Sequence, residues 1–409
     1  MSYPNACMSW PTDASFTPAT VRSHSNSRNG AMAGLTVDGG SLAERVLELG
    51  STGYASWLDR KPHRKLIEER GLPKLRAEAW RHTNVTRFYD AVLSGPETPP
   101  KRTRLELPEG VEAVDFASVR ASELVAQRGE ETFSLSAHPL AALNALRLGA
   151  GVAIRVPAGV AAPGPVRIGD LPAAHQRILV IVETGAKLEV IEEPSTYTHR
   201  LLEAVVQPGG RLSHRRLQAA SSGRECSLVA VRTEADARYD LAQTALGADL
   251  RRNDILATLA GDGAAVGIRG AWRLDESRHL DNQVAVRHAA PGGTSRQAYR
   301  GVADGRSRAV LNGRIEIAPG AQHSDAMLST KNLLASDTAE VYAKPELEIY
   351  ANDVKCSHGA TIGAIDDDAV HYFRSRGIDE RTARSLFVRG FLREAIDDVE
   401  AAQRLGVIP

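Results

Sequence analysis

The sequence predicts a mainly β protein whose β region is bracketed by helices. Between residues 151 and 363, short apolar or alternating runs are separated by turns rich in Gly, Pro, Asn and Asp, a pattern typical of strands. Helical spacing of apolar residues is almost absent there but occurs on both sides of that stretch. The length of 409 residues exceeds one simple core, and a hydrophobic content of 43% is enough to bury a large one.

The N-terminal part divides into a tail and a helical domain. Residues 1–35 are rich in Ser, Asn, Thr, Pro and Gly, so we expect a disordered tail. Residues 36–150 are predicted to form a mostly helical domain, with helices expected at 118–127 and 139–148. Four prolines within 95–110 predict an irregular connection there.

The predicted β core covers residues 151–363. The run 178–182 is apolar at every position, which favours a parallel strand buried on both faces. Polar residues close to the turns fit the corners of a β-solenoid, because Asn tolerates left-handed backbone. Four asparagines are expected at such places: Asn253, Asn282, Asn312 and Asn332. Because the turn spacing is irregular, the pattern favours a solenoid but leaves a sandwich or barrel open.

Residues 364–409 are predicted to form a C-terminal helical domain. The acidic run at 366–368 supplies an N-cap and favourable charges for a first helix, and Gly377 fits its end. Asp379 can cap the next helix. The apolar residues that follow form a broad stripe on one helix face, and they are Phe387, Val388, Phe391, Leu392, Ala395, Ile396 and Val399.

The bulk composition limits the function classes. Fifty Lys and Arg residues balance fifty Asp and Glu residues, so no net charge attracts nucleic acid or anionic membrane. Three distant cysteines, Cys7, Cys226 and Cys356, do not form a disulfide framework and indicate a reducing compartment. No apolar run is long enough to span a bilayer, and no secretory signal is recognisable, so we expect a cytoplasmic protein.

Cys356 and His358 are the best candidates for metal chemistry. They are two residues apart, so on one strand they would share a face. A thiolate and an imidazole suit iron, zinc or copper(I). Zinc and iron–sulfur centres usually have four protein ligands, so the pair is at most half of a site. The missing ligands would come from elsewhere in this chain or from a partner; alternatively, the pair is a buried thiol beside a hydrogen-bonded imidazole.

Other patterns carry less chemistry. The acidic run at 366–368 contains the groups of a cation site, but a solvated helix cap explains it better. His323, Ser324 and Asp325 have the residue types of a hydrolase triad, but neighbours in sequence do not have triad geometry. No Gly-Lys-Ser/Thr phosphate loop occurs. If the function of this protein is driven by ATP, we therefore expect another subunit to bind the nucleotide.

A long C-terminal motif resembles a known family. Residues 344–361 read KPELEIYANDVKCSHGAT, and HYFRSRGI follows at 371–378. Together with GFLRE, TKNLL and NGRI nearby, these runs resemble the SufD branch of the SufB/SufD family of the Suf iron–sulfur assembly machinery. The resemblance is clear from about 281 to 397 and weaker through the middle. Two shorter anchors lie upstream, EAWRHTN at 78–84 and HPLAALN at 138–144.

The resemblance implies a fold, partners and sites. It implies a right-handed parallel β-helix between helical end domains, and a non-catalytic scaffold that pairs with a SufB homologue and contributes to the site of nascent cluster formation and iron acquisition. His358 would be a cluster ligand or local base, and Cys356 a second candidate ligand. The C-terminal helices would bind the SufC ATPase; the candidate contacts are Phe387, Phe391, Leu392 and Ile396.

The cofactor expectations follow from the same resemblance. It implies no tightly bound cofactor in the isolated chain, a transient iron–sulfur cluster or iron in the complex, and an association of the complex with reduced flavin. Two other readings remain open, a SufB-type scaffold and a β-helix enzyme acting on polysaccharide. Homodimerisation of the isolated chain also remains open, as does Met32 as an alternative start.

Overall fold

The computed structural model describes most of the chain, and the described residues belong to one compact unit, Val37–Pro409. They are residues 45, 48, 52–74, 77–94, 103–127, 138–195, 197–220, 222–396 and 398–408. The predicted tail at 1–35, and Cys7 within it, lie outside this set. No helix of the described residues is long and apolar enough to cross a membrane.

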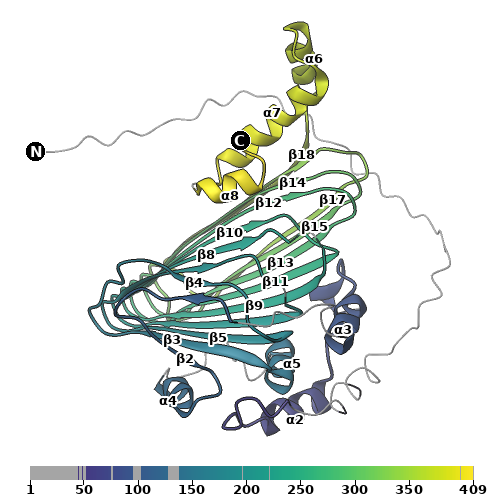
Figure 1. Cartoon of the computed structure of the whole chain (residues 1–409). Helices are drawn as coiled ribbons and strands as arrows, with labels where there is room; N and C mark the ends of the chain where they lie inside the picture. The colour runs from purple at the N-terminus through teal and green to yellow at the C-terminus, as the bar shows by residue number, and fades with distance from the viewer. Residues whose placement is uncertain are drawn as a thin grey trace, which may run out of the picture. The chain divides into compact units, whose positions relative to one another are not determined.

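Two sheets of nine strands each dominate the described residues (Figure 1). The first sheet has the order β1 (Leu105–Glu106), β4 (Val166–Ile168), β6 (Lys187–Glu192), β8 (Arg211–Gln218), β10 (Arg238–Ala245), β12 (Ala265–Leu274), β14 (Thr294–Ala303), β16 (Asp325–Leu334) and β18 (Lys355–Ala364). The second runs from β17 (Glu340–Ile349) through β15 (Arg308–Ile317), β13 (His279–His288), β11 (Leu250–Leu259), β9 (Arg224–Thr233), β7 (His199–Val206), β5 (His175–Val182) and β3 (Ala150–Val156) to β2 (Glu112–Asp115).

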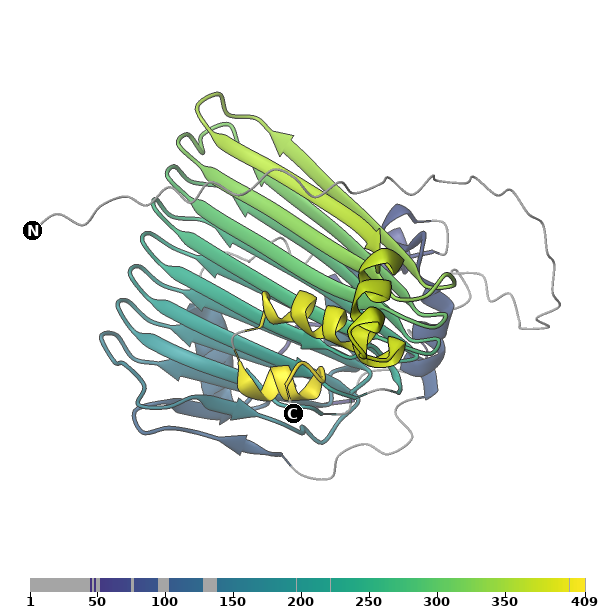
Figure 2. The same cartoon turned by 90° about the horizontal axis from the view of Figure 1, so that it is seen from above.

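Successive strands from β3 onward alternate between the two sheets, and each pairs in parallel with the strand two places along the chain. This is a β-solenoid, as predicted, and not a sandwich of antiparallel strands. Figure 2 shows the parallel rungs of the stack from above. The handedness of the coil stays a prediction from the family resemblance.

The first strands differ from the rest of the solenoid. The short β1 pairs antiparallel with β4, and β2 pairs antiparallel with β3. Both lie before residue 150, where the sequence predicted helices and, at 95–110, an irregular connection. Strands of two and four residues are too short to show the period that identifies a strand in a sequence. At the other end, β17 and β18 are the last strands of their sheets.

The apolar core fills the space between the sheets. The run 178–182 lies in β5, which is buried along its whole length. Ile178 and Val180 belong to the core between the sheets, whereas Leu179 and Ile181 pack outside the solenoid with the aromatic Phe116. Burial on both faces explains why this strand is apolar at consecutive positions, as the sequence predicted.

The placement of the asparagines at solenoid corners was wrong. Asn253 and Asn282 lie within β11 and β13, face the interior, and are fully buried. Asn253 Nδ2 donates to Asn282 Oδ1 over 2.9 Å and to Gln218 Oε1 over 3.1 Å. These side-chain amides form hydrogen bonds with each other across the interior, and without such bonds they would be costly to bury. The corners instead use glycine, for example Gly263 at φ 67°.

Two reciprocal pairs of aromatic and glycine residues join β12 to β14. Gly270 lies beside Tyr299, and Trp272 lies beside Gly301 on the same two strands. A Cβ atom on Gly270 would lie 2.2 Å from the Tyr299 ring, and one on Gly301 would lie 2.0 Å from the Trp272 ring. Each glycine therefore provides the space that the neighbouring ring occupies.

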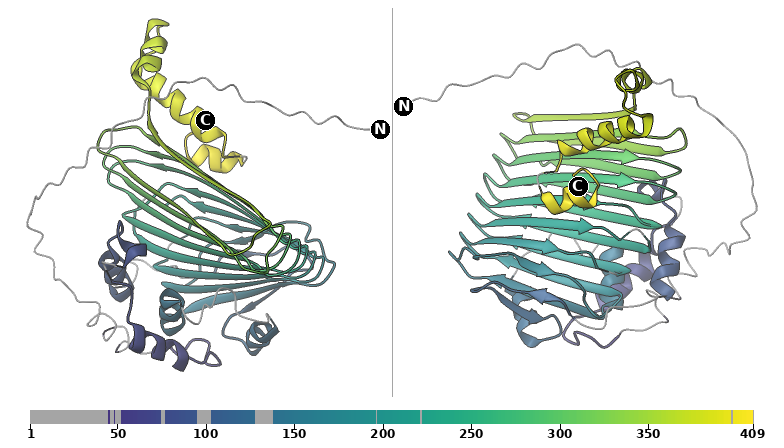
Figure 3. Two further views of the ribbon diagram at one scale, coloured as in Figure 1. Left: turned by 180° about the vertical axis from the view of Figure 1, so that it is seen from behind. Right: turned by 45° about the horizontal axis from the view of Figure 1, so that its top comes forward.

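The helices lie outside the solenoid, and the helix that follows β18 projects beyond the stack (Figures 1 and 3). Those preceding β3 are α2 (Lys61–Arg70), η1 (Glu78–Trp80), α3 (Val85–Ser94), α4 (Val119–Gln127) and α5 (Pro139–Arg147). The helices expected at 118–127 and 139–148 are confirmed. Phe88 of α3 and Leu143 of α5 share an apolar cluster with Cys226 of β9, so α3 and α5 cover the second sheet.

Three helices follow β18: α6 (Asp367–Ser375), α7 (Glu380–Arg393) and α8 (Val399–Arg404). The Asp366 carboxylate accepts from the Asp368 N–H at the start of α6, and the Asp379 carboxylate accepts from the Thr382 N–H at the start of α7. Both predicted caps are confirmed. The helices share a buried apolar cluster with Ala271 and Val302 of the first sheet. The division into separate domains stays a prediction.

Candidate functional site

Cys356 and His358 lie on β18, the final strand of the first sheet. The preceding strand β17 ends at Ile349, so the strand does not continue unbroken into this motif. In register with β16, Cys356 lies beside Ala326 and His358 beside Leu328. Those two β16 residues are in the core, so Cys356 and His358 both project from the interior side of β18, on the shared face that the sequence predicted.

The two side chains differ in their surroundings. Cys356 is half-buried against the core, and His358 is exposed. Burial, with a smaller contribution from the charge of Asp325, raises the pKa of the Cys356 thiol. Since the thiolate is the form that binds metal, a metal ion must displace this proton. Among the described residues, no group of three His, Cys, Asp or Glu side chains could hold a metal ion. The role of Cys356 and His358 as metal ligands therefore stays a prediction.

The strands around this pair form an open end of the solenoid. Both β17 and β18 have ten residues, and each pairs with a neighbour on one side alone. Val341 and Leu347 of β17 pack against the core from this end. Ile349, Tyr350 and Ile362 are exposed, with exposed fractions of 42%, 60% and 45%. Unpaired strands of this length are a template for pairing with another chain, and Lys344 and Pro345 are the residues of β17 that oppose such pairing.

The predicted ATPase contacts lie on α7 and just after it. Leu392 is fully buried and Ile396 is 6% exposed, within the cluster that holds the C-terminal helices to the sheet. Phe387 packs edge-on against Phe373, and Arg300 of β14 lies over the Phe391 ring. This stripe therefore packs mainly on its own chain. The exposed apolar side chains here are Tyr372, Leu386 and Val399, of which the sequence analysis named only Val399.

The N-terminal anchor at residues 78–84 docks on the outer face of the second sheet. Arg252 of β11 donates to the Ala79 carbonyl over 2.7 Å, and its guanidinium lies 3.8 Å from the centre of the Trp80 ring. Arg252 is also paired with Asp281 over 2.8 Å, and Thr83 donates to the same carboxylate over 2.6 Å. This anchor is a structural junction that holds the segment before α3 in place.

Sequence reasoning missed a second cluster, buried inside the solenoid. Glu192 accepts hydrogen bonds from Arg200, Arg216 and His214 over 3.0, 2.7 and 2.9 Å. Burial opposes the charge of this carboxylate, but the charge of Arg216, the hydrogen bond from His214 and the charge of Arg200 outweigh burial and hold the pKa of Glu192 well below its usual range. His214 and Arg216 alternate with exposed or half-buried residues along β8, and that alternation was the only signal available.

Comparison with known proteins yields a family and several relatives. Residues 167–391 match the family model described as the SUF system FeS cluster assembly, SufBD core domain. The chain is 33% identical to ABCI7, chloroplastic, of Arabidopsis thaliana over 236 residues, which is 56% of this chain and 50% of that protein. It is 36% identical to the iron–sulfur cluster assembly protein SufD of Escherichia coli over 163 residues, 39% of this chain and 38% of that protein.

A third relative is a SufBD family protein of Synechocystis, 28% identical over 245 residues, which covers 56% of this chain and 54% of that protein. The chain thus spans about half the length, or less, of the curated relatives it matches. The matched family region begins in β4 and ends in α7, so it includes β18 with Cys356 and His358.

Proposed function

Because the chain belongs to the SufBD family of iron–sulfur cluster assembly proteins, we propose that it is a SufD-like, non-catalytic scaffold subunit. It would pair with a SufB homologue through the open end of the solenoid, and bind a SufC ATPase through its C-terminal helices. A nascent cluster or iron would be cargo at the junction. Family membership favours this role over a polysaccharide-active enzyme.

The observation that carries the pairing is the open end itself. Two ten-residue strands present unpaired backbone edges and an apolar inner side. A homologous chain could present strands of matching spacing, since neighbouring strands lie about 4.8 Å apart in any sheet. Cys356 and His358 project from the same end, so ligands of the second chain would complete the half-site.

The pairing is tested by a charge placed on the edge. Ile362 projects from the interior side of β18 beside Asn332 of β16, and it is 45% exposed. In Ile362→Asp a carboxylate would be buried at the junction, so we expect at least a tenfold loss of affinity, about 1.4 kcal/mol or more. The measurement is co-purification with, and titration by, the SufB homologue.

The control is Leu107→Asp. Leu107 is 43% exposed and follows β1, at the opposite end of the same sheet. The Leu107→Asp variant should leave the affinity for the SufB homologue unchanged. Equal losses from both variants, or none from Ile362→Asp, would contradict pairing through the open end.

Binding of SufC would use the side chains that the C-terminal helices leave exposed. Leu386 of α7 is 41% exposed and Tyr372 of α6 is 58% exposed. We expect Leu386→Asp to weaken ATPase binding by roughly tenfold, because burying an added charge in an interface is costly, while pairing with the SufB homologue is retained. Pull-down of the ATPase by each variant measures this, and undiminished binding would remove α7 from the interface. Reduced flavin in the complex stays a prediction.

A further inference from the structure

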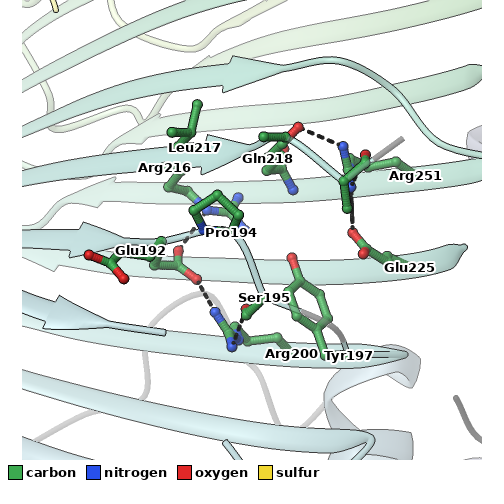
Figure 4. A pocket seen from close by; sticks show the side chains of 13 residues that line it. Glu192, Pro194, Ser195, Tyr197, Arg200, Arg216, Leu217, Gln218, Glu225 and Arg251 are labelled. Carbon is green, nitrogen blue, oxygen red and sulfur yellow. Dashed lines mark hydrogen bonds and ion pairs between the residues drawn. The ribbon is translucent and has the colours of Figure 1, made fainter. Parts of the chain in front are cut away.

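A small cavity lies beside the buried arginines near one corner of the solenoid. Its volume is about 20 Å³, and it is lined by residues of β6, β7, β8 and β9, by Arg251, and by described residues of the loops that follow β6 and β8 (Figure 4). A single water needs a space of roughly 10–15 Å³. The cavity therefore has room for one atom-sized ligand but not for phosphate, sulfate or a nucleotide.

The buried charges around the cavity do not balance. Arg200, Arg216 and Arg251 are each at most 3% exposed, and they face two buried carboxylates, Glu192 and Glu225. His214 adds no charge near neutral pH, because burial lowers its pKa. A third carboxylate, Glu193, also lines the cavity. It is directed to the surface, where it pairs with Arg104 and Arg167 over 3.2 Å each. One buried positive charge is left over.

The excess charge is located on Arg216. Arg200 uses all three of its nitrogens in hydrogen bonds, to Gln176, Glu192, Gly169 and Ser195. Arg251 does the same with Glu225 and with main-chain carbonyls. Arg216 donates from Nε to Glu192 over 2.7 Å, but its buried Nη1 has no hydrogen-bond partner among the described residues. A buried guanidinium donor without an acceptor is costly.

Tyr197 provides a second donor. It is 6% exposed, lines the cavity, and packs its ring 4.4 Å from the Arg200 guanidinium. Burial raises the pKa of its hydroxyl, so Tyr197 is neutral and does not supply the missing negative charge. Its hydroxyl has no hydrogen-bond partner among the described residues but, unlike Arg216 Nη1, it is not one of the fully buried atoms. Figure 4 shows the Tyr197 ring between the Arg200 and Arg251 groups.

We propose that this cavity binds one monatomic-sized, monovalent anion, either chloride or hydrosulfide, on Arg216 Nη1 and the Tyr197 hydroxyl. Such an anion matches the cavity in volume, neutralises the excess charge, and accepts from both unpartnered donors. Pro194, Ser195, Ala219 and Ala220 are only half-buried at the rim, so an ion can enter there. The site does not depend on the proposed scaffold role.

Bromide is the probe for the test, because its anomalous scattering distinguishes it from water. Crystals of the full chain grown without chloride and soaked in bromide should give an anomalous peak in hydrogen-bond contact with Arg216. In solution, chloride should broaden the chlorine NMR line in proportion to the protein concentration. A peak-free cavity that contains water alone overturns the proposal.

Three variants sharpen the test. Arg216→Lys keeps the charge but loses the forked donor, and we expect at least tenfold weaker bromide binding; Tyr197→Phe removes one donor only and should weaken binding several-fold. Arg211→Lys is the matched control, because Arg211 lies on the same strand but is exposed, and it should bind bromide normally. Equal bromide occupancy in all three would overturn the proposal, and Tyr197→Phe keeps the test valid if Arg216→Lys does not fold.

A competition under anaerobic conditions distinguishes the two anions. If hydrosulfide reduces the chlorine line broadening at concentrations below those of chloride, the physiological ligand is hydrosulfide. If chloride is retained, the site is a structural chloride site. Both results support the anion site, whereas acetate displacing chloride equally well would overturn it, because acetate is too large for the cavity.

Discussion

The two ends of the solenoid differ in the length and direction of their last strands. At the first end, the sheets close with β1 and β2, strands of two and four residues that run antiparallel to their neighbours. At the last end, they stop at β17 and β18, ten residues each and parallel to their neighbours. Short edge strands and charges discourage pairing with other chains, whereas long apolar edges favour it.

Charge does not distinguish the two ends, because β17 also carries ion pairs, Glu340 with Arg308 and Glu348 with Arg314. Glu112 of β2 is paired with Arg120 over 2.9 Å and with Arg155 over 3.2 Å, so the first edge of the second sheet carries an ion-pair network. On the last edge, the residues turned to the interior include Val341, Leu347 and Ile362. Strand length and direction therefore separate the two ends, and the last end has the longer unpaired strands, β17 and β18.

The largest expected effect is on the free energy of unfolding. It comes from replacing an arginine in the part of the second sheet that helices cover, compared with an arginine near the open end. Arg252→Ala leaves the carboxylates of Asp254 and Asp281 buried without their cation. We expect a loss of about 3–5 kcal/mol in the free energy of unfolding, because breaking a buried pair strands its partner charge. Urea denaturation monitored by circular dichroism measures this loss.

Arg308→Ala is the comparison. Arg308 pairs with Glu340 between β15 and β17, where both side chains are 44% exposed. Exposed pairs contribute about 0–1 kcal/mol, so the expected loss is small. Similar losses from the two variants would mean that the covered and open regions are equally dependent on ionic contacts.

A second expected effect is the pH dependence of stability. Burial lowers the pKa of His175 to about 3 and that of His279 to about 4. An unfolded histidine has a pKa of about 6.5 and binds a proton first, so the free energy of unfolding should fall as the pH drops below about 6.5. In His175→Leu the slope should decrease by roughly 1.4 kcal/mol per pH unit between pH 6 and 4.

Denaturant midpoints measured at each pH provide the measurement. His175 lies on β5, and its ring packs against that of His199 in the covered part of the second sheet. His371 of α6 is an exposed control, and His371→Leu should leave the slope unchanged. An unaltered slope in His175→Leu would place the acid sensitivity elsewhere in the chain.

The smallest effect on stability is expected at the open end. His358 is exposed on β18, so His358→Ala should change the free energy of unfolding by no more than about 0.5 kcal/mol. The same variant should impair cluster formation, measured as iron and acid-labile sulfide in the complex with the SufB homologue and the ATPase. Normal cluster content would remove His358 from the site.

The strands and the candidate pair could be predicted because their signals are local. Alternation identified most of the β core, and the spacing of Cys356 and His358 placed both on one face of β18. The contacts of Gln218 and Asn253 could not be predicted, because they join β8 to β11 across the interior and depend on the register of the whole coil. The sequence also does not show which side of α7 packs on the first sheet. The predicted ATPase contacts therefore included Leu392 and Ile396, which are buried.

The interlock of Trp272 with Gly301 and of Tyr299 with Gly270 has a consequence for how this protein can evolve. Solenoids commonly gain or lose whole repeats by duplication or deletion, because each repeat contacts only its neighbours. Removing the coil that carries β14 would place Thr330 and Asn332 beside the two β12 positions, and Trp272 would meet a side chain where it now meets none. Losing this one coil would therefore disrupt the ring packing between β12 and its new neighbour.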